Sequence, residues 1–185
     1  MQRLLERWMR RLRSTVSPLA GTLIDVGIGE GLCLERVLQG APRDSRVVAG
    51  IEYRVDKARI ASGLDGVQVM VADAGMVPVR DAAADVVTCI EVLEHLPTVR
   101  PALAELARIT ARPHGRCIVS VPWEPWFRLG NLGRAKNVAR LGNDPEHVGW
   151  FTPRRLCDAL APHFAEIRLE PTFPWLIAEA RRPST

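Results

Sequence analysis

The chain has 185 residues, of which 47% are hydrophobic and 25% charged, so it suits one compact globular domain over residues 1–185 and excludes a disordered or fibrous protein. Its formal net charge of +4 comes largely from arginines, and so modest an excess is more typical of a solvated basic face than of a nucleic-acid-binding protein. The sequence has no run of about 18 apolar residues and no apolar core of a secretory signal, which predicts a cytoplasmic protein.

The first predicted element is an amphipathic helix over residues 1–16. Its apolar residues recur at helical spacing with arginines between them: Leu4, Leu5, Trp8, Met9 and Leu12. Such a helix either packs its apolar stripe against the domain or lies on a membrane surface. We favour packing against the domain, with weak association with a membrane surface as the alternative.

Short apolar runs at 22–27, 46–52, 67–73, 84–91 and 116–122 alternate with helical patterns. This alternation is typical of a parallel sheet flanked by helices. The four cysteines of the chain are far apart and form no CxxC pair, so we interpret them as core residues in a reducing compartment.

Residues 123–149 break the alternation and are rich in Trp, Gly, Asn and Arg, with a weak helical stretch in their middle. A helix is predicted next, with Thr152 as N-cap and Pro153 at its first position. The last two extended segments are separated only by Pro171 to Pro174. Because so short a gap leaves no room for a crossover helix, these segments should pair antiparallel.

The first predicted strand runs into Gly27, Gly29 and Gly31 and then into a helix. Glycines there let the backbone turn tightly and approach a ligand, and the helix start offers unpaired N–H groups. A dinucleotide-binding GxGxxG pattern would need its third glycine at Leu32, so the spacing disfavours a dinucleotide. Asp25, two residues before the first glycine, favours a cationic ligand over a diphosphate.

Two more acids follow the next two strands. Glu52 ends the second strand, where a carboxylate can accept hydrogen bonds from both hydroxyls of a ribose. Asp73 ends the third, followed by Ala74, and can receive the amino group of a nucleobase. Each acid alone could cap a helix or form a turn. Together with Asp25 they lie at the carboxyl ends of parallel strands, where open α/β sheets bind ligands.

Taken in order, these motifs resemble the class I S-adenosylmethionine-dependent methyltransferases over residues 22 to 121. They comprise DVGIGEG, Glu52, VADA around Asp73, ADVVTCIEVLEH and the turn RPHGR, in which His114 replaces the usual glycine. The resemblance implies an α/β, Rossmann-like seven-stranded sheet with helices on both faces and an antiparallel last strand. It also implies S-adenosylmethionine as cofactor.

The resemblance further implies which residues meet the cofactor. They are Asp25, Gly27, Gly29 and Gly31 at its methionine part, Glu52 at the ribose, Asp73 and Ala74 at the adenine, and Ile90 lining the site, with Tyr53 as a further cofactor-binding residue. In this family, substrate-specific elements follow the fifth strand, so residues 123–149 are expected to form an insertion that determines the acceptor.

Glu91, Glu94 and His95 follow the fourth strand directly, and positions i, i+3 and i+4 of a helical turn share one face. This ExxEH pattern resembles the ubiquinone-pathway O-methyltransferases, whose two glutamates and histidine are associated with a divalent metal. The small-RNA 3′-end methyltransferases use a similar motif with a later histidine, and His147 supplies one here. Such a donor set suits Mn²⁺, Fe²⁺ or Zn²⁺ better than Mg²⁺.

Three roles are open for this motif: it holds a divalent metal, takes a proton, or only braces the turn. Transfer of a methyl group to a hydroxyl or amine requires a group that accepts the acceptor's proton. His95, His147 and Glu91 are the candidate catalytic residues, since an imidazole titrates near neutral pH. His147 could instead tie the insertion to the body of the domain.

We therefore expect an S-adenosylmethionine-dependent methyltransferase, monomeric or homodimeric, whose substrate is a small molecule methylated on oxygen. One alternative is a nucleic-acid methyltransferase of the RNA 3′-end type, with a phosphate track on the amino-terminal helix and on the basic residues of the insertion, Arg128, Arg134, Lys136 and Arg140. Another is a non-catalytic, cofactor-binding partner subunit. The shortage of further RNA-binding sequence in 185 residues disfavours nucleic acid.

Overall fold

The computed structural model describes residues 2–17, 21–39, 46–133 and 147–181. A seven-stranded sheet of order β3-β2-β1-β4-β5-β7-β6 runs through them. The strands are β1 (Gly21–Val26), β2 (Arg46–Glu52), β3 (Val67–Val71), β4 (Val86–Ile90), β5 (Arg116–Pro122), β6 (Glu166–Thr172) and β7 (Trp175–Arg181). Strands β1 to β5 are parallel, and β7 runs antiparallel to both β5 and β6. The predicted sheet with its antiparallel last strand is thus confirmed.

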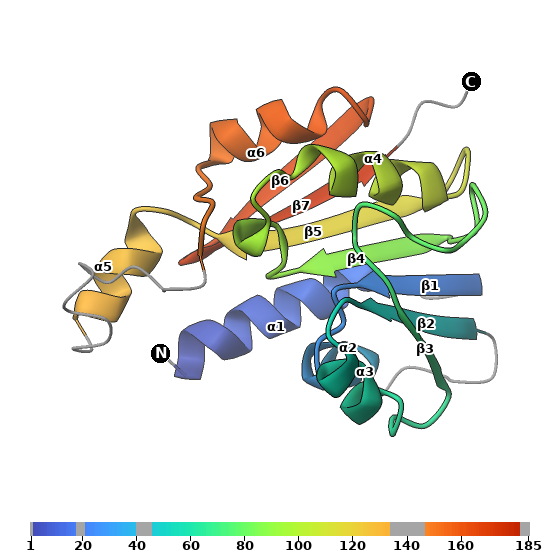
Figure 1. Cartoon of the computed structure of the whole chain (residues 1–185). Helices are drawn as coiled ribbons and strands as arrows, with labels where there is room; N and C mark the ends of the chain where they lie inside the picture. The colour runs from blue at the N-terminus through green and yellow to red at the C-terminus, as the bar shows by residue number, and fades with distance from the viewer. Residues whose placement is uncertain (1, 18–20, 40–45, 134–146, 182–185) are drawn as a thin grey trace.

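The helices form a layer on each face of the sheet, with α1, α2 and α3 on one side and α4 and α6 on the other (Figure 1). Their bounds are α1 (Gln2–Val16), α2 (Leu32–Leu38), α3 (Val55–Ala61), α4 (Arg100–Ile109), α5 (Trp126–Leu132) and α6 (Pro153–Leu160). A single 3₁₀ turn, η1 (Leu93–His95), follows β4. In the described ranges, no helix combines the length and apolar character needed to cross a membrane.

Helix α1 packs on the sheet through one apolar stripe. Trp8, Leu12 and Val16 are buried and join the core cluster on that face, whereas Arg3 and Arg7 are exposed. This confirms the prediction that the apolar stripe packs against the domain. The interior strands β4 and β5 are almost fully buried because helices cover both their faces, which accounts for their near-continuous apolar runs.

The carboxyl-terminal part forms as predicted, with one difference. The Thr152 side chain accepts a hydrogen bond from the Arg155 backbone N–H at 3.3 Å, and Pro153 begins α6. Pro171, predicted as part of the turn, lies inside β6 instead, so the β6–β7 connection is shorter than expected. Proline is tolerated there because β6 is an edge strand, where one row of backbone N–H groups has no partner strand.

The insertion is described only at its two ends, 123–133 and 147–149. The backbone N–H of Trp123 donates to the carbonyl of Pro174, and that of Glu124 to the carbonyl of Phe151, both at 2.9 Å. These bonds attach the first end of the insertion to the β6–β7 turn and to Phe151, which lies two residues after the second end. The described part of the insertion contains the helix α5 (Trp126–Leu132), whereas Arg134, Lys136 and Arg140 lie outside the described residues.

Candidate active site

A cavity of about 740 Å³ lies at the carboxyl ends of β1, β2, β3 and β4. Its volume is in the range of small-molecule binding sites, roughly 300 to 1,000 Å³. The residues predicted to meet the cofactor line it, with the exception of Gly31: Asp25, Gly27, Gly29, Glu52, Tyr53, Asp73, Ala74 and Ile90. Four separate stretches of the chain therefore converge on one site.

Gly27, Gly29 and Gly31 of the loop all have positive φ, but their surroundings differ. A Cβ on Gly29 would meet nothing within 4 Å, so this position is open for a ligand. A Cβ on Gly27 would lie 2.3 Å from the Val92 side chain. A Cβ on Gly31 would lie 2.2 Å from the Leu64 side chain, so Gly31 is required for packing between the start of α2 and the turn after α3.

Asp25 is a buried carboxylate at the end of β1, with 4% of its surface exposed. Burial raises the pKa of Asp25 to about 6, the hydrogen bond donated by the Thr88 hydroxyl at 2.6 Å opposes this, and the Glu52 charge adds to it. An ionised carboxylate in such a place is costly unless a positive charge lies nearby. The site at this end of the cavity is therefore suited to a cationic ligand.

Glu52 is held at the cavity wall by two backbone donors. The N–H of Gly29 donates to one carboxylate oxygen at 2.9 Å, and that of Arg54 to the other at 2.8 Å. Each oxygen keeps a lone pair, so the group can still accept two hydrogen bonds from adjacent hydroxyls. The bond from Gly29 also links the end of β2 to the glycine loop.

Asp73 and Tyr53 lie in the part of the cavity formed by β2 and β3. One carboxylate oxygen of Asp73 accepts a hydrogen bond from the backbone N–H of Gly75 at 2.7 Å, which shapes the turn after β3. Tyr53 lines the cavity yet is 72% exposed, so a bound ligand can cover its ring. Ala74 lies between Asp73 and Gly75 and is half-buried.

Glu91 follows β4 in a left-handed conformation, with φ of 56°, which residues other than glycine rarely adopt. The indole N–H of Trp175 donates to one carboxylate oxygen at 2.9 Å, and the Ser120 hydroxyl to the other at 3.2 Å. The indole N–H of Trp8 in turn donates to Ser120 at 2.9 Å. Burial raises the pKa of Glu91 to about 7, against the lowering effect of Trp175 and Ser120.

The expectation that Glu91 shares a helical face with Glu94 and His95 is not met. That expectation requires a regular helix from Glu91 onward, but the chain instead makes a left-handed residue and one 3₁₀ turn. The Glu91 side chain therefore contacts Ser120 and Trp175, while the two later residues turn toward His147.

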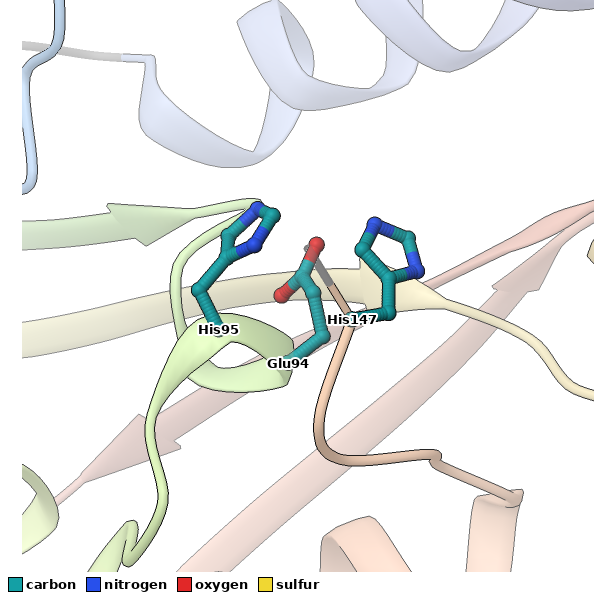
Figure 2. Close-up of side chains that lie close together, drawn as sticks. All are labelled: Glu94, His95 and His147. Carbon is teal, nitrogen blue, oxygen red and sulfur yellow. The ribbon is translucent and has the colours of Figure 1, made fainter. Parts of the chain in front are cut away.

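Glu94, His95 and His147 form a separate group, in which one ligand atom from each lies within 4.8 Å of the others. The Glu94 carboxylate lies close to both imidazole rings, which face each other edge to face with their centroids 5.0 Å apart (Figure 2). The Glu94 carbonyl accepts hydrogen bonds from the backbone N–H groups of Val148 and Gly149, both at 2.9 Å. These two bonds bring the end of the insertion to η1, so His147 contacts residues that lie more than fifty positions earlier in the sequence.

The Glu94 side chain is 1% exposed, and neither of its oxygens has a hydrogen-bond partner within the described ranges. Burial, with the Glu91 charge as the next cause, raises the pKa of Glu94 well above its usual range. Leaving a buried polar group unpaired costs about 1 to 3 kcal/mol, and more for a charge. A metal cation would remove this cost, and one carboxylate with two imidazoles is a donor set typical of iron or zinc sites with open positions. These three residues fit a divalent transition metal.

Sequence reasoning did not find Trp8, Ser120 and Trp175. Their hydrogen bonds to Glu91 or to one another join residues 29 to 112 positions apart in the chain. Trp8 and Trp175 also stack with their ring centroids 5.1 Å apart. No local spacing marks such a group, because it exists only after α1, β5 and β7 have packed together.

Comparison with known proteins shows similarity to methyltransferases. A family model described as a methyltransferase domain matches residues 24–119. The 27-O-demethylrifamycin SV methyltransferase of Amycolatopsis mediterranei is 30% identical over 174 residues, which are 88% of this chain and 58% of that protein. The present chain thus spans little more than half the length of this relative.

Solved structures share the fold at low sequence identity. An S-adenosylmethionine-dependent methyltransferase of Thermotoga maritima has a TM-score of 0.72 at 17% identity, over 97% of this chain and 91% of its own. Phosphoethanolamine N-methyltransferase 2 of Haemonchus contortus, in complex with S-adenosylmethionine, has a TM-score of 0.70 at 11% identity, over 95% of this chain and 52% of its own.

The sheet order, and a cavity at the carboxyl ends of the parallel strands, place the chain in the class of proteins with this methyltransferase fold. Within that class, the chain belongs to the family of the methyltransferase domain that matches residues 24–119.

Proposed function

We propose that this enzyme transfers the methyl group of S-adenosylmethionine to an oxygen of a small-molecule acceptor that binds beside Glu94, His95 and His147. The observation that carries the proposal is the buried Glu94 carboxylate, which has no hydrogen-bond partner among the described residues. His95 belongs to this group and also lines the cofactor cavity, so the acceptor and donor sides meet at His95. The relative from Amycolatopsis carries an O-demethyl substrate in its name, which is consistent with an oxygen acceptor.

On the donor side, the chain's own residues would bind and orient the cofactor. Asp73, with Ala74 beside it, would accept a hydrogen bond from the adenine amino group, and Glu52 would accept those of the ribose hydroxyls. Asp25 and the glycine loop would surround the charged methionine part. Holding donor and acceptor in line removes a large part of the barrier to a displacement reaction, on the order of several kcal/mol.

On the acceptor side, Glu94, His95 and His147 would hold a divalent metal. When bound, such an ion polarises a neighbouring hydroxyl group and lowers its pKa. An imidazole that holds a metal cannot also take the acceptor's proton. In the metal-independent version of the proposal, His95 or His147 takes this proton, and Glu91 is the third candidate because its pKa of about 7 suits general-base catalysis.

The experiment is methyl transfer from labelled S-adenosylmethionine to a panel of catechols and hydroquinones, to the matched aromatic amines, and to short RNA. We expect label on the hydroxyl compounds, and about 10- to 100-fold less of it with Glu94→Gln or His147→Gln. Glu166→Gln removes an exposed glutamate of β6 and serves as the matched control. Label found only on amines or only on RNA would contradict the proposal.

A further inference from the structure

The cavity wall carries a carboxylate that the binding of adenine and ribose does not use. Ile90, Glu91 and Val92 all line the cavity after β4. Asp25 and Glu91 line this cavity together with Cys33. Two carboxylates besides those of Glu52 and Asp73 therefore face its interior.

The Glu91 carboxylate is fixed in its position. Trp175 and Ser120 each hold one oxygen, at 2.9 and 3.2 Å, and the backbone N–H of Glu91 donates to the Ser120 carbonyl at 2.9 Å. The residue keeps a positive φ that favours glycine, which the surrounding contacts must stabilise. Such backbone strain is found mainly where a side chain has to be held in one place for function.

Helix α1 completes this support. Trp8 donates its indole N–H to the Ser120 hydroxyl at 2.9 Å and stacks on Trp175, and the ring of Trp175 also lies 6.1 Å from that of Phe127. Trp8 therefore contacts both side chains that bind Glu91, namely Ser120 and Trp175. The amino-terminal helix is in this way part of the wall of the site.

Glu91 lies in the chain between residues of the donor side and residues of the acceptor side. It lies between Ile90, which lines the cavity, and Glu94 and His95, which belong to the acceptor group. The reacting carbon must lie between the donor sulfur and the acceptor atom. Of Asp25 and Glu91, Glu91 directly follows Ile90 in the cavity wall, which His95 of the acceptor group also lines, whereas Asp25 lies beside the glycine loop.

Resting on the proposed function, we infer that Glu91 faces the sulfonium of S-adenosylmethionine and makes the site prefer the donor to its product. In the reaction, the carbon–sulfur bond breaks with its electron pair left on sulfur, the oxygen–carbon bond forms, and the acceptor's proton leaves to a base. The positive sulfonium thereby becomes a neutral thioether. A fixed carboxylate in a poorly hydrated wall attracts the sulfonium of the donor and not the neutral thioether of the product. This difference favours exchange of product for fresh donor.

The test compares the dissociation constants of S-adenosylmethionine and S-adenosylhomocysteine by titration calorimetry. Wild-type protein is expected to bind S-adenosylmethionine more tightly than S-adenosylhomocysteine. Glu91→Gln is expected to reduce this preference about tenfold, mainly by weakening the binding of S-adenosylmethionine. Trp175→Phe, which keeps an aromatic ring but removes the N–H donor, should reduce the preference in the same direction. Glu35→Gln removes an exposed charge of α2 outside the cavity and should leave the ratio unchanged.

Binding of S-adenosylhomocysteine reports in every variant whether the site is folded. A ratio that stays the same in Glu91→Gln, whether both ligands bind as before or weaken in parallel, would overturn the inference while leaving the cofactor assignment intact. Wild-type protein that binds neither compound would overturn the proposed function and this inference together.

Discussion

A divalent metal should stabilise the folded protein through Glu94, and a single isosteric change should abolish the effect. Glu94→Gln keeps the size of the side chain but removes the only carboxylate of the group formed with His95 and His147. In the metal-free state the variant should be at least as stable as the wild type, because the wild type buries a carboxylate whose oxygens lack partners in the described part of the chain.

The size of the effect follows from linkage. An ion present at about 100 times its dissociation constant adds about 2.7 kcal/mol to the free energy of unfolding if it binds only the folded state. For a chain of 185 residues this corresponds to a rise in Tm of about 5 to 10 °C. Glu94→Gln and His147→Gln should each lose most of that rise, since each removes one of three ligands.

The assay is thermal unfolding of chelator-treated protein before and after addition of Mn²⁺, Zn²⁺ or Fe²⁺ under anaerobic conditions. Glu166→Gln, on the exposed face of β6, controls for loss of a glutamate and should respond as the wild type does. Equal melting temperatures of the wild type with and without every ion would refute the metal assignment. In that case His95 and His147 would be left as candidate bases.

Three further predictions concern Asp25, the glycine loop and Trp8. Affinity for S-adenosylmethionine should fall as the pH is lowered through about 6, because protonation of Asp25 removes the charge that attracts the cation; calorimetry of Asp25→Asn between about pH 5 and 8 should show a flatter dependence. Gly29→Ala should cost about tenfold in this affinity and about 1 kcal/mol of stability from its positive φ alone, because its Cβ would meet no atom within 4 Å. Gly31→Ala should lower the free energy of unfolding by more, about 1 to 3 kcal/mol in urea titrations, because its φ is also positive and its Cβ would meet Leu64 at 2.2 Å. Trp8→Phe should cost about 1 to 3 kcal/mol by the same titration, since it leaves the buried Ser120 hydroxyl with one bond fewer.

The parallel strands and the edge of the sheet that carries the candidate site could be predicted from the chain because both depend on local pattern. Apolar runs ending in an acid or a glycine mark the carboxyl ends of parallel strands, and these ends meet at one edge of a sheet. Asp25, Glu52 and Asp73 therefore reach one cavity, as the sequence indicates. Thr152 and Pro153 likewise mark the start of α6 through chemistry confined to one turn.

Side-chain directions at the acceptor end could not be predicted in the same way. The helical spacing of Glu91 and Glu94 suggests a shared face, but the positive φ of Glu91 sends its carboxylate toward Trp175. That conformation depends on contacts with β5 and β7, which no local pattern encodes. Gly31 shows the same limit, since its place in a ligand-binding loop conceals a packing role against Leu64.

Calorimetric titration of S-adenosylmethionine into the wild type and into Glu52→Ala tests the account most directly. The wild type should bind one molecule per chain. Glu52→Ala should bind at least about tenfold more weakly, because it loses both the acceptor of the ribose hydroxyls and the hydrogen bond that links β2 to Gly29. Absence of binding by the wild type, or equal affinity in the two proteins, would contradict the assignment of this cavity to the methyl donor.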